Sequence, residues 1–216
     1  MSMEERLLRT SADIKSPLIV AVACFAGDIA APSELVSALP ADWGPAIIFA
    51  EQPSAAGHAS QLAEALMKIT TLPVMRADDG CLVEYRSIYL VPRNVALKVT
   101  CGRIHAIPGT KDIDCLADSL FISLAQESGG KAIGVILSGG GSDRALGIRA
   151  IRQAGGTTFA QHPGSARFPN LPISAIDTGC VDFVLRPNEI AHGLTHISRH
   201  DGKSPRGLPA LTKSWS

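Results

Sequence analysis

The chain has 216 residues and carries 20 Lys and Arg against 20 Asp and Glu, so its formal net charge is zero. With 46% hydrophobic and 19% charged residues, it holds enough apolar mass for a folded core of one-domain size. A neutral chain lacks the basic face that non-specific nucleic-acid binding needs, so we expect no nucleic-acid partner. Its apolar runs, such as residues 46–50, fall far short of the ~20 residues that span a bilayer, so we expect no membrane insertion.

The start of the chain mixes acidic and basic side chains without an apolar core, which is unlike a signal peptide. The five cysteines are scattered and form no CxxC pair, a pattern typical of reduced thiols in a cytoplasmic protein. We therefore expect a cytoplasmic protein with five free thiols, no bound metal and no cofactor. All cysteines except Cys24 are interpreted as small buried side chains.

Short apolar runs and amphipathic segments alternate along the first part of the chain. Residues 17–23 (PLIVAVA) are apolar throughout and include β-branched side chains, which predicts a buried parallel strand. Pro32 suits the first turn of the helix that follows. The alternation continues with a strand at 46–50, a helix at 60–69 and a strand at 72–75. Ile69 is predicted to lie on the buried face of its helix.

The hydrophobic period changes after Gly80. Two short strands, at 87–92 and 95–100, lead through a turn into a strand at 103–107, which predicts a local antiparallel excursion. Alternation then resumes with a helix that Asp114 or Asp118 caps and that runs to Leu124. It continues with strands at 132–137, 157–161 and 181–185, and helices at 143–153 and 187–198.

The helix at 143–153 has a clear amphipathic pattern. Leu146, Ile148 and Ile151 are predicted to face the core, whereas Arg149 and Arg152 point to solvent.

Repeated strand–helix units with one hairpin predict an α/β fold. We expect a doubly wound, mostly parallel, Rossmann-like sheet with helices on both faces and a small antiparallel hairpin excursion. The domain is expected to span residues 17–198, after an N-terminal extension at 1–16. Residues 199–216 lack periodicity and contain Gly and Pro, which predicts a disordered tail.

Ligands of such folds bind at the carboxyl ends of the strands, which selects the loops at 24–31, 51–58 and 138–144. The last loop, SGGGSDR, resembles an anion-binding turn but lacks the Gly-Lys-Ser/Thr of a P-loop and the third glycine of a dinucleotide motif. We interpret it as a tight turn, with an anion or small-molecule site as the alternative. Asp143 either caps the next helix or orients a catalytic histidine.

Three histidines, His192, His196 and His200, recur at every fourth position near the last predicted helix. This spacing is similar to that of metal ligands, but no acid or cysteine accompanies them as in HExxH. We interpret them as a solvent-exposed face of the helix.

Several separated blocks of the sequence resemble one family in the same order. They are residues 39–42 (LPAD), 77–80 (ADDG), 88–92 (IYLVP), 121–129 and 132–185. On these blocks the chain resembles the CheB family, the protein-glutamate methylesterases of bacterial chemotaxis, and above all the methylesterase-like domains of CheB/CheR hybrid proteins. The resemblance implies a Ser-His-Asp triad on strand-end loops and hydrolysis of glutamyl methyl esters on methyl-accepting chemoreceptors, without metal or cofactor.

The family's triad carries over to this sequence only in part. The first loop of the family resembles Gly-Ala-Ser-x-Gly-Gly, and the gap-free register from residues 39–40 places Phe25 on the serine. The second resembles Gln-His, and Gln52 stands at the histidine. The third resembles Gly-x-Gly-x-Asp-Gly, in which Asp143 is retained and Arg144 replaces the glycine.

These replacements predict a degenerate domain that acts as a binding or regulatory module, with a chemoreceptor or another signalling protein as its partner. Phe25 has no nucleophilic atom, and Gln52 cannot carry a proton. One alternative is an active esterase with rebuilt chemistry, using Cys24 as nucleophile together with His58 or His162. Arg144 is expected to pair with Asp143 or to meet an acidic partner.

Overall fold

The computed structural model describes residues 17–52, 61–92, 95–107, 116–140 and 145–200. The expected N-terminal extension and most of the expected tail lie outside these ranges. The strands are β1 (Ile19–Phe25), β2 (Ala46–Gln52), β3 (Val74–Arg76), β4 (Ile88–Leu90), β5 (Ala96–Thr100), β6 (Arg103–Ile107), β7 (Ile133–Ile136), β8 (Thr157–Gln161) and β9 (Phe183–Leu185). The helices are α2 (Ala30–Ser37), α3 (Leu62–Ile69), α4 (Leu116–Ser128), α5 (Ala145–Gln153), α6 (Asn170–Asp177) and α7 (Pro187–Arg199).

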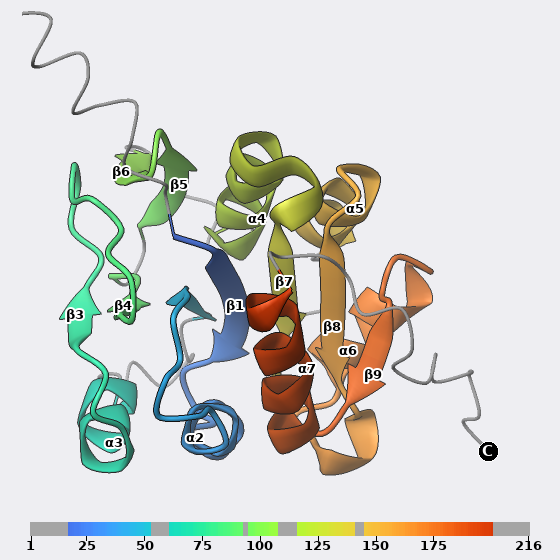
Figure 1. Cartoon of the computed structure of the whole chain (residues 1–216). Helices are drawn as coiled ribbons and strands as arrows, with labels where there is room; N and C mark the ends of the chain where they lie inside the picture. Colours follow the sequence, from blue (N-terminus) through green and yellow to red (C-terminus); the bar gives the residue numbers. More distant parts are fainter. Residues whose placement is uncertain (1–16, 53–60, 93–94, 108–115, 141–144, 201–216) are drawn as a thin grey trace, which may run out of the picture.

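Seven strands form one sheet in the order β3-β4-β2-β1-β7-β8-β9 (Figure 1). Every pairing within it is parallel, so all seven strands end at the same edge. The chain builds outward from β1 to β2 and later returns to the other side of β1 with β7. The fold predicted from the sequence, a doubly wound and mostly parallel α/β sheet, is confirmed, and its topological switch point lies between β1 and β7.

Helices cover both faces of this sheet. Val20, Val22 and Cys24 of β1 share one buried cluster with apolar residues of α2, α3 and α7. Ala21 and Ala23 share the other cluster with residues of α4, α5 and α6. Because successive residues of a strand point to opposite faces, the side chains of Cys24 and of the residue after it leave β1 in opposite directions.

The antiparallel hairpin is smaller than the sequence predicted. Strands β5 and β6 pair antiparallel, and their connection has positive φ at both Cys101 (51°) and Gly102 (68°), as a tight hairpin turn requires. Strand β4, predicted to belong to this excursion, instead pairs parallel with β2 and β3. Its side chains explain this, since Ile88 is buried in one core cluster and Tyr89 in the other.

Three side chains predicted to be buried are exposed. Ile148 and Ile151 face the core as expected, but Leu146 is 63% exposed. The helix turns Gly147 toward α4, so closely that a Cβ there would lie 2.7 Å from Cβ of Phe121, and this orientation points Leu146 away from the sheet. Ile69, the last residue of α3, is 41% exposed.

The third exposed side chain is Cys101, at the β5–β6 turn, whereas Cys81 and Cys180 are half-buried. These three residues and Cys24 are free thiols, and Cys115 lies outside the described residues. Cys101 is the outward residue of this turn, whereas Gly102 is buried and its N–H donates to Oε1 of Glu127 at 2.9 Å.

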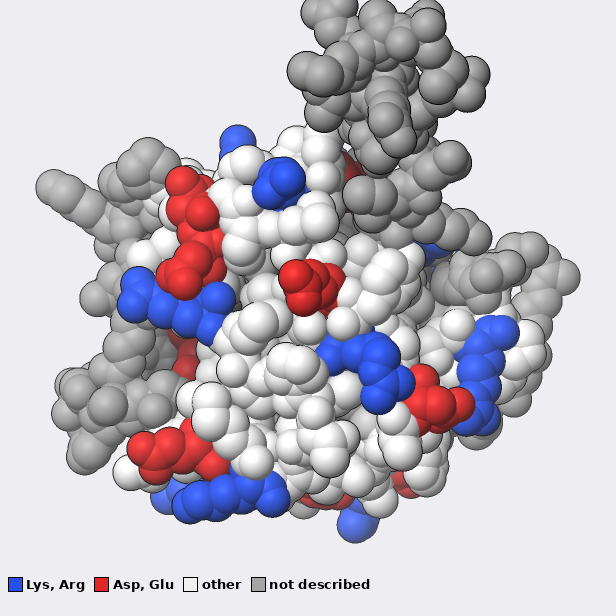
Figure 2. Space-filling model, turned by 60° about the vertical axis from the view of Figure 1, so that its left-hand side comes forward, with Lys and Arg blue, Asp and Glu red and all other residues white. Residues whose placement is uncertain are grey.

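The described surface carries both signs of charge. Figure 2 shows Lys and Arg side chains interspersed with Asp and Glu on the face that it presents. Within the described part of the chain, no helix is both long enough and apolar enough to span a bilayer.

Candidate functional site

The loops selected from the sequence begin at one place on the sheet. Strands β2, β1 and β7 are neighbours, and their carboxyl ends meet at the edge drawn at the bottom of Figure 1. Phe25 and Gln52, the last residues of β1 and β2, are partners in the strand register. The N–H of Phe25 donates to the carbonyl oxygen of Ser138, in the loop after β7, at 3.1 Å. The structure therefore brings the described parts of these loops together.

The ring of Phe25 packs within this edge. It meets the ring of Phe168 edge-on, with centroids 5.0 Å apart and planes at 70°. It also lies against Gly27, where a Cβ would stand 2.6 Å from Cε1 of Phe25. The guanidinium carbon of Arg167 lies 5.3 Å from the centroid of Phe168, and its Nη1 donates to the carbonyl oxygen of Gly27 at 3.3 Å. Two aromatic rings thus occupy the space at the end of β1.

Cys24, the residue considered as an alternative nucleophile, lies in the core. Its side chain is 1% exposed and belongs to the cluster beneath α2 and α7. Burial raises the pKa of the Cys24 thiol well above its usual value, and the negative charges of Glu51 and Asp28 raise it further. Because the thiolate is the reactive form, this environment suppresses nucleophilic chemistry at Cys24.

The remaining triad positions are described less fully. Gln52 is placed by its backbone in β2, while its side chain lies outside the description. Asp143 and Arg144 both lie outside the described residues, as does His58. The proposed pairing of Arg144 with Asp143 therefore stays a prediction.

A carboxylate from α4 holds the beginning of the helix that follows this loop. Asp118 is only 5% exposed, and its Oδ1 accepts a hydrogen bond from the N–H of Gly147 at 2.8 Å. Gly147 lies in the first turn of α5, whose N–H groups have no partner within the helix. Asp118, considered from the sequence as a cap for its own helix, thus caps α5 across the α4–α5 contact. Asp114 lies outside the described residues.

The loop after β7 is tied to the segment after β8. The N–H of Ser138 donates to Oε1 of Gln161 at 2.8 Å, and the hydroxyl of Ser138 accepts from the N–H of Phe168 at 3.0 Å. Gln161 also donates through Nε2 to the carbonyl oxygen of Ser165 at 3.0 Å. Sequence reasoning missed Gln161 and Phe168. The one available sequence signal was a polar side chain, Gln161, at the carboxyl end of the predicted strand at 157–161.

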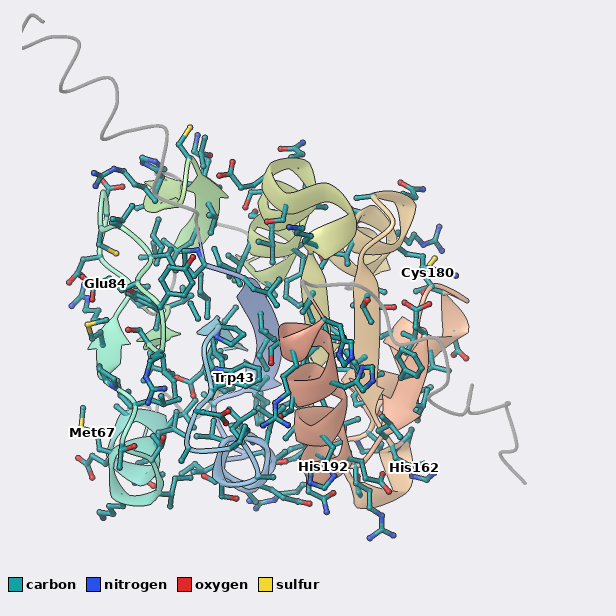
Figure 3. All side chains as sticks on the ribbon, viewed as in Figure 1. Trp43, Met67, Glu84, His162, Cys180 and His192 are labelled. Atoms are coloured by element: carbon teal, nitrogen blue, oxygen red, sulfur yellow. The ribbon has the colours of Figure 1, made fainter. Side chains whose placement is uncertain are left out.

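The histidines do not assemble into a metal centre in the described part of the chain. His192, His196 and His200 are exposed, as predicted, and the rings of the last two stack with centroids 4.2 Å apart. His162 follows β8 at the carboxyl edge, near the lower end of the molecule in Figure 3, and its Nδ1 accepts from the N–H of Gly164 at 3.1 Å. Among the described residues, no group of His, Cys, Asp and Glu is placed to hold a metal ion.

Comparison with known proteins connects this arrangement to curated relatives. The protein-glutamate methylesterase/protein-glutamine glutaminase 3 of Paramagnetospirillum magneticum is 34% identical over 183 residues, covering 83% of this chain and 51% of that protein. Protein-glutamate methylesterase/protein-glutamine glutaminase 1 of Myxococcus xanthus is 32% identical over 190 residues, covering 85% of this chain and 54% of that protein. The chain spans about half the length of these relatives.

The structural match supports the fold. The crystal structure of the Thermotoga maritima CheB methylesterase catalytic domain has a TM-score of 0.74 and 24% sequence identity to this chain. The match covers 85% of this chain and 100% of the other. A family model described as CheB methylesterase matches residues 20–194, which is most of the chain and includes nearly the whole described sheet. The chain therefore belongs to the CheB methylesterase family.

Proposed function

We propose that this domain is a catalytically degenerate member of its family that acts as a binding or regulatory module in chemotaxis-type signalling. One observation carries the proposal. Phe25, the residue aligned with the family's serine, ends β1 at the topological switch point, and its ring packs against Phe168. A phenyl ring thus stands at the position where the alignment requires a nucleophile.

The chemistry of ester hydrolysis explains why this replacement matters. The family's serine attacks the ester carbonyl, and the histidine takes the serine proton and delivers it to the leaving methanol. Phe25 offers no atom for the attack, and the amide of Gln52 neither accepts nor releases that proton at neutral pH. Asp143 is retained in the sequence, but its role in a triad is to orient a histidine. What remains for the domain is binding.

An active cysteine esterase is the alternative, and the geometry disfavours it. Cys24 and Phe25 leave β1 on opposite faces, so the thiol lies under α2 rather than at the strand-end loops. A thiol with a raised pKa and 1% exposure meets neither the substrate nor a base.

The proposed partner is a methyl-accepting chemoreceptor or another cytoplasmic signalling protein. Support comes from relatives whose names state activity on protein glutamate and glutamine side chains. The chain shares the fold of such a catalytic domain, and the proposal is that the surface for a protein partner persists where the reacting groups are replaced.

Methanol release from a methylated receptor tests the proposal. The purified protein is expected to release no methanol above the uncatalysed rate, while the Paramagnetospirillum magneticum relative serves as the active control. Release by the wild type that disappears in Cys24→Ala would establish the cysteine esterase. Release that does not depend on Cys24 would show that the alignment of the first two loops is wrong.

A further inference from the structure

A cavity of about 400 Å³ lies beside the end of β1, on the side of β8. The β1–α2 connection, α2, the end of β8 and the segment after it supply most of its lining, together with Gln61 before α3. Its charged side chains are Asp28, Glu34 and Arg167. Pockets of roughly 300–1,000 Å³ hold small ligands, and a few placed polar groups set which ligand they select. Among the described residues, neither Phe25 nor the glycines of the 138–144 loop line it, although Gly27, which packs against the Phe25 ring, does.

Asp28 is the most unusual of these groups. Its side chain is only 4% exposed, and its Oδ1 accepts one hydrogen bond, from the N–H of Ala30 at 3.1 Å. This local bond to the first residue of α2 involves Oδ1 only. Among the described residues, the only fully buried side-chain nitrogen and oxygen atoms without a hydrogen-bond partner are Trp43 Nε1 and Thr157 Oγ1. Oδ2 of Asp28, which accepts no hydrogen bond from described residues, is therefore reached by solvent, and the cavity is the space it borders.

Arg167 supplies the opposite charge. Its guanidinium donates through Nη1 to the carbonyl oxygen of Gly27 and lies over the ring of Phe168, contacts that fix the group and leave further N–H donors. No ion pair joins Arg167 to a described carboxylate, and the same holds for Asp28 and Glu34. Charges of both signs thus line one cavity without neutralising each other directly.

We propose that this cavity binds a small zwitterion, an α-amino acid, with its ammonium group on Asp28 and its carboxylate on Arg167. A nearly buried carboxylate selects a cation, because leaving it without a counter-charge costs free energy. A guanidinium is the donor best matched to a carboxylate. Two acidic side chains in the lining disfavour a simple anion, the ligand considered from the glycine-rich loop.

The experiment is a thermal-shift screen of the wild-type protein with single L-amino acids at millimolar concentration, followed by calorimetric titration of the best one. At least one amino acid should raise the melting temperature, because a ligand of the folded state stabilises it. Its N-acetyl derivative lacks the ammonium charge and its carboxamide lacks the carboxylate, and each should bind about tenfold more weakly or worse.

The variants Asp28→Asn and Arg167→Gln should each lower affinity by about tenfold or more. Asn keeps the oxygen that accepts from the N–H of Ala30, and Arg167 is exposed, so both variants are expected to fold. The matched controls, Asp177→Asn and Arg149→Gln, change exposed groups outside the cavity and should bind normally. The proposal is overturned if no amino acid shifts the melting temperature, if both blocked derivatives bind equally well, or if the two cavity variants bind like the controls. None of these outcomes depends on whether the protein hydrolyses esters.

Discussion

The contact between Phe25 and Phe168 predicts a measurable coupling in stability. The rings meet edge-on at 5.0 Å, a geometry worth about 0.5–1.5 kcal/mol beyond simple burial. Both side chains are half-buried, so each single change to alanine should cost about 1–2 kcal/mol, roughly half or more of what full burial of a large apolar side chain contributes. The double variant should then lose less stability than the sum of the two single losses.

Urea unfolding of the wild type, Phe25→Ala, Phe168→Ala and the double variant completes the thermodynamic cycle. The expected coupling free energy is about 0.5–1.5 kcal/mol. Leu146→Ala is a matched control, because this large apolar side chain is 63% exposed, and it should be additive with Phe25→Ala. A coupling indistinguishable from zero between Phe25 and Phe168 would refute the reasoning that two packed rings occupy the end of β1.

Three further predictions concern Asp118, Cys101 and Cys24. Asp118→Ala leaves the Gly147 N–H without its acceptor and should lower the free energy of unfolding, measured in urea, by about 1–3 kcal/mol. Asp118→Asn keeps an acceptor oxygen and should lower it less. Equal losses in the two variants would contradict the role of Asp118 as the cap of α5. In the native protein a thiol reagent should modify exposed Cys101 within minutes and leave Cys24 intact, as mass spectrometry would show, and fast labelling of Cys24 would contradict its burial. Because burial raises the pKa of Cys24 in the folded state, stability should fall as pH rises above about 8.5, where unfolded thiols ionise, and Cys24→Ala should reduce this fall.

The central strands could be predicted from sequence because each is a short apolar run whose residues are buried on both faces. The predicted strand at 157–161 matches β8, and the run at 17–23 overlaps β1. Strand β4 was assigned to the wrong partner, because its place is set by non-local contacts. Leu82, which precedes β4, forms an antiparallel β-bridge with Arg103 of the hairpin, and no local sequence pattern predicts this contact.

The buried face of α5 could be predicted from sequence only in part. The prediction for Leu146 was wrong because this residue lies about 160° around the helix from Ile148 and about 140° from Ile151, so one face cannot bury all three; Gly147 makes the close approach to α4 instead. A helix advances 100° per residue, about 3.6 residues per turn, so turning Gly147 and Ile148 inward carries Leu146 outward.

The candidate site, too, could be predicted from sequence only in part. The positions of Phe25 and Gln52 followed from the register of strands and family motifs, and the structure places them as neighbours. The roles of Asp28, Gln161 and Arg167 depend on segments that meet only in the folded chain, so their sequence neighbourhoods gave no sign of a shared cavity or hydrogen-bond network.

Methanol release from a methylated receptor by the wild type and by Phe25→Ser with Gln52→His tests the central claim most directly. The account predicts no release by the wild type or by either single variant, because a serine without a base stays protonated and a base without a nucleophile has nothing to activate. It predicts measurable release by the double variant, with the retained Asp143 orienting the new histidine. Release by the wild type at or above the rate of the double variant would contradict the claim that the domain is degenerate.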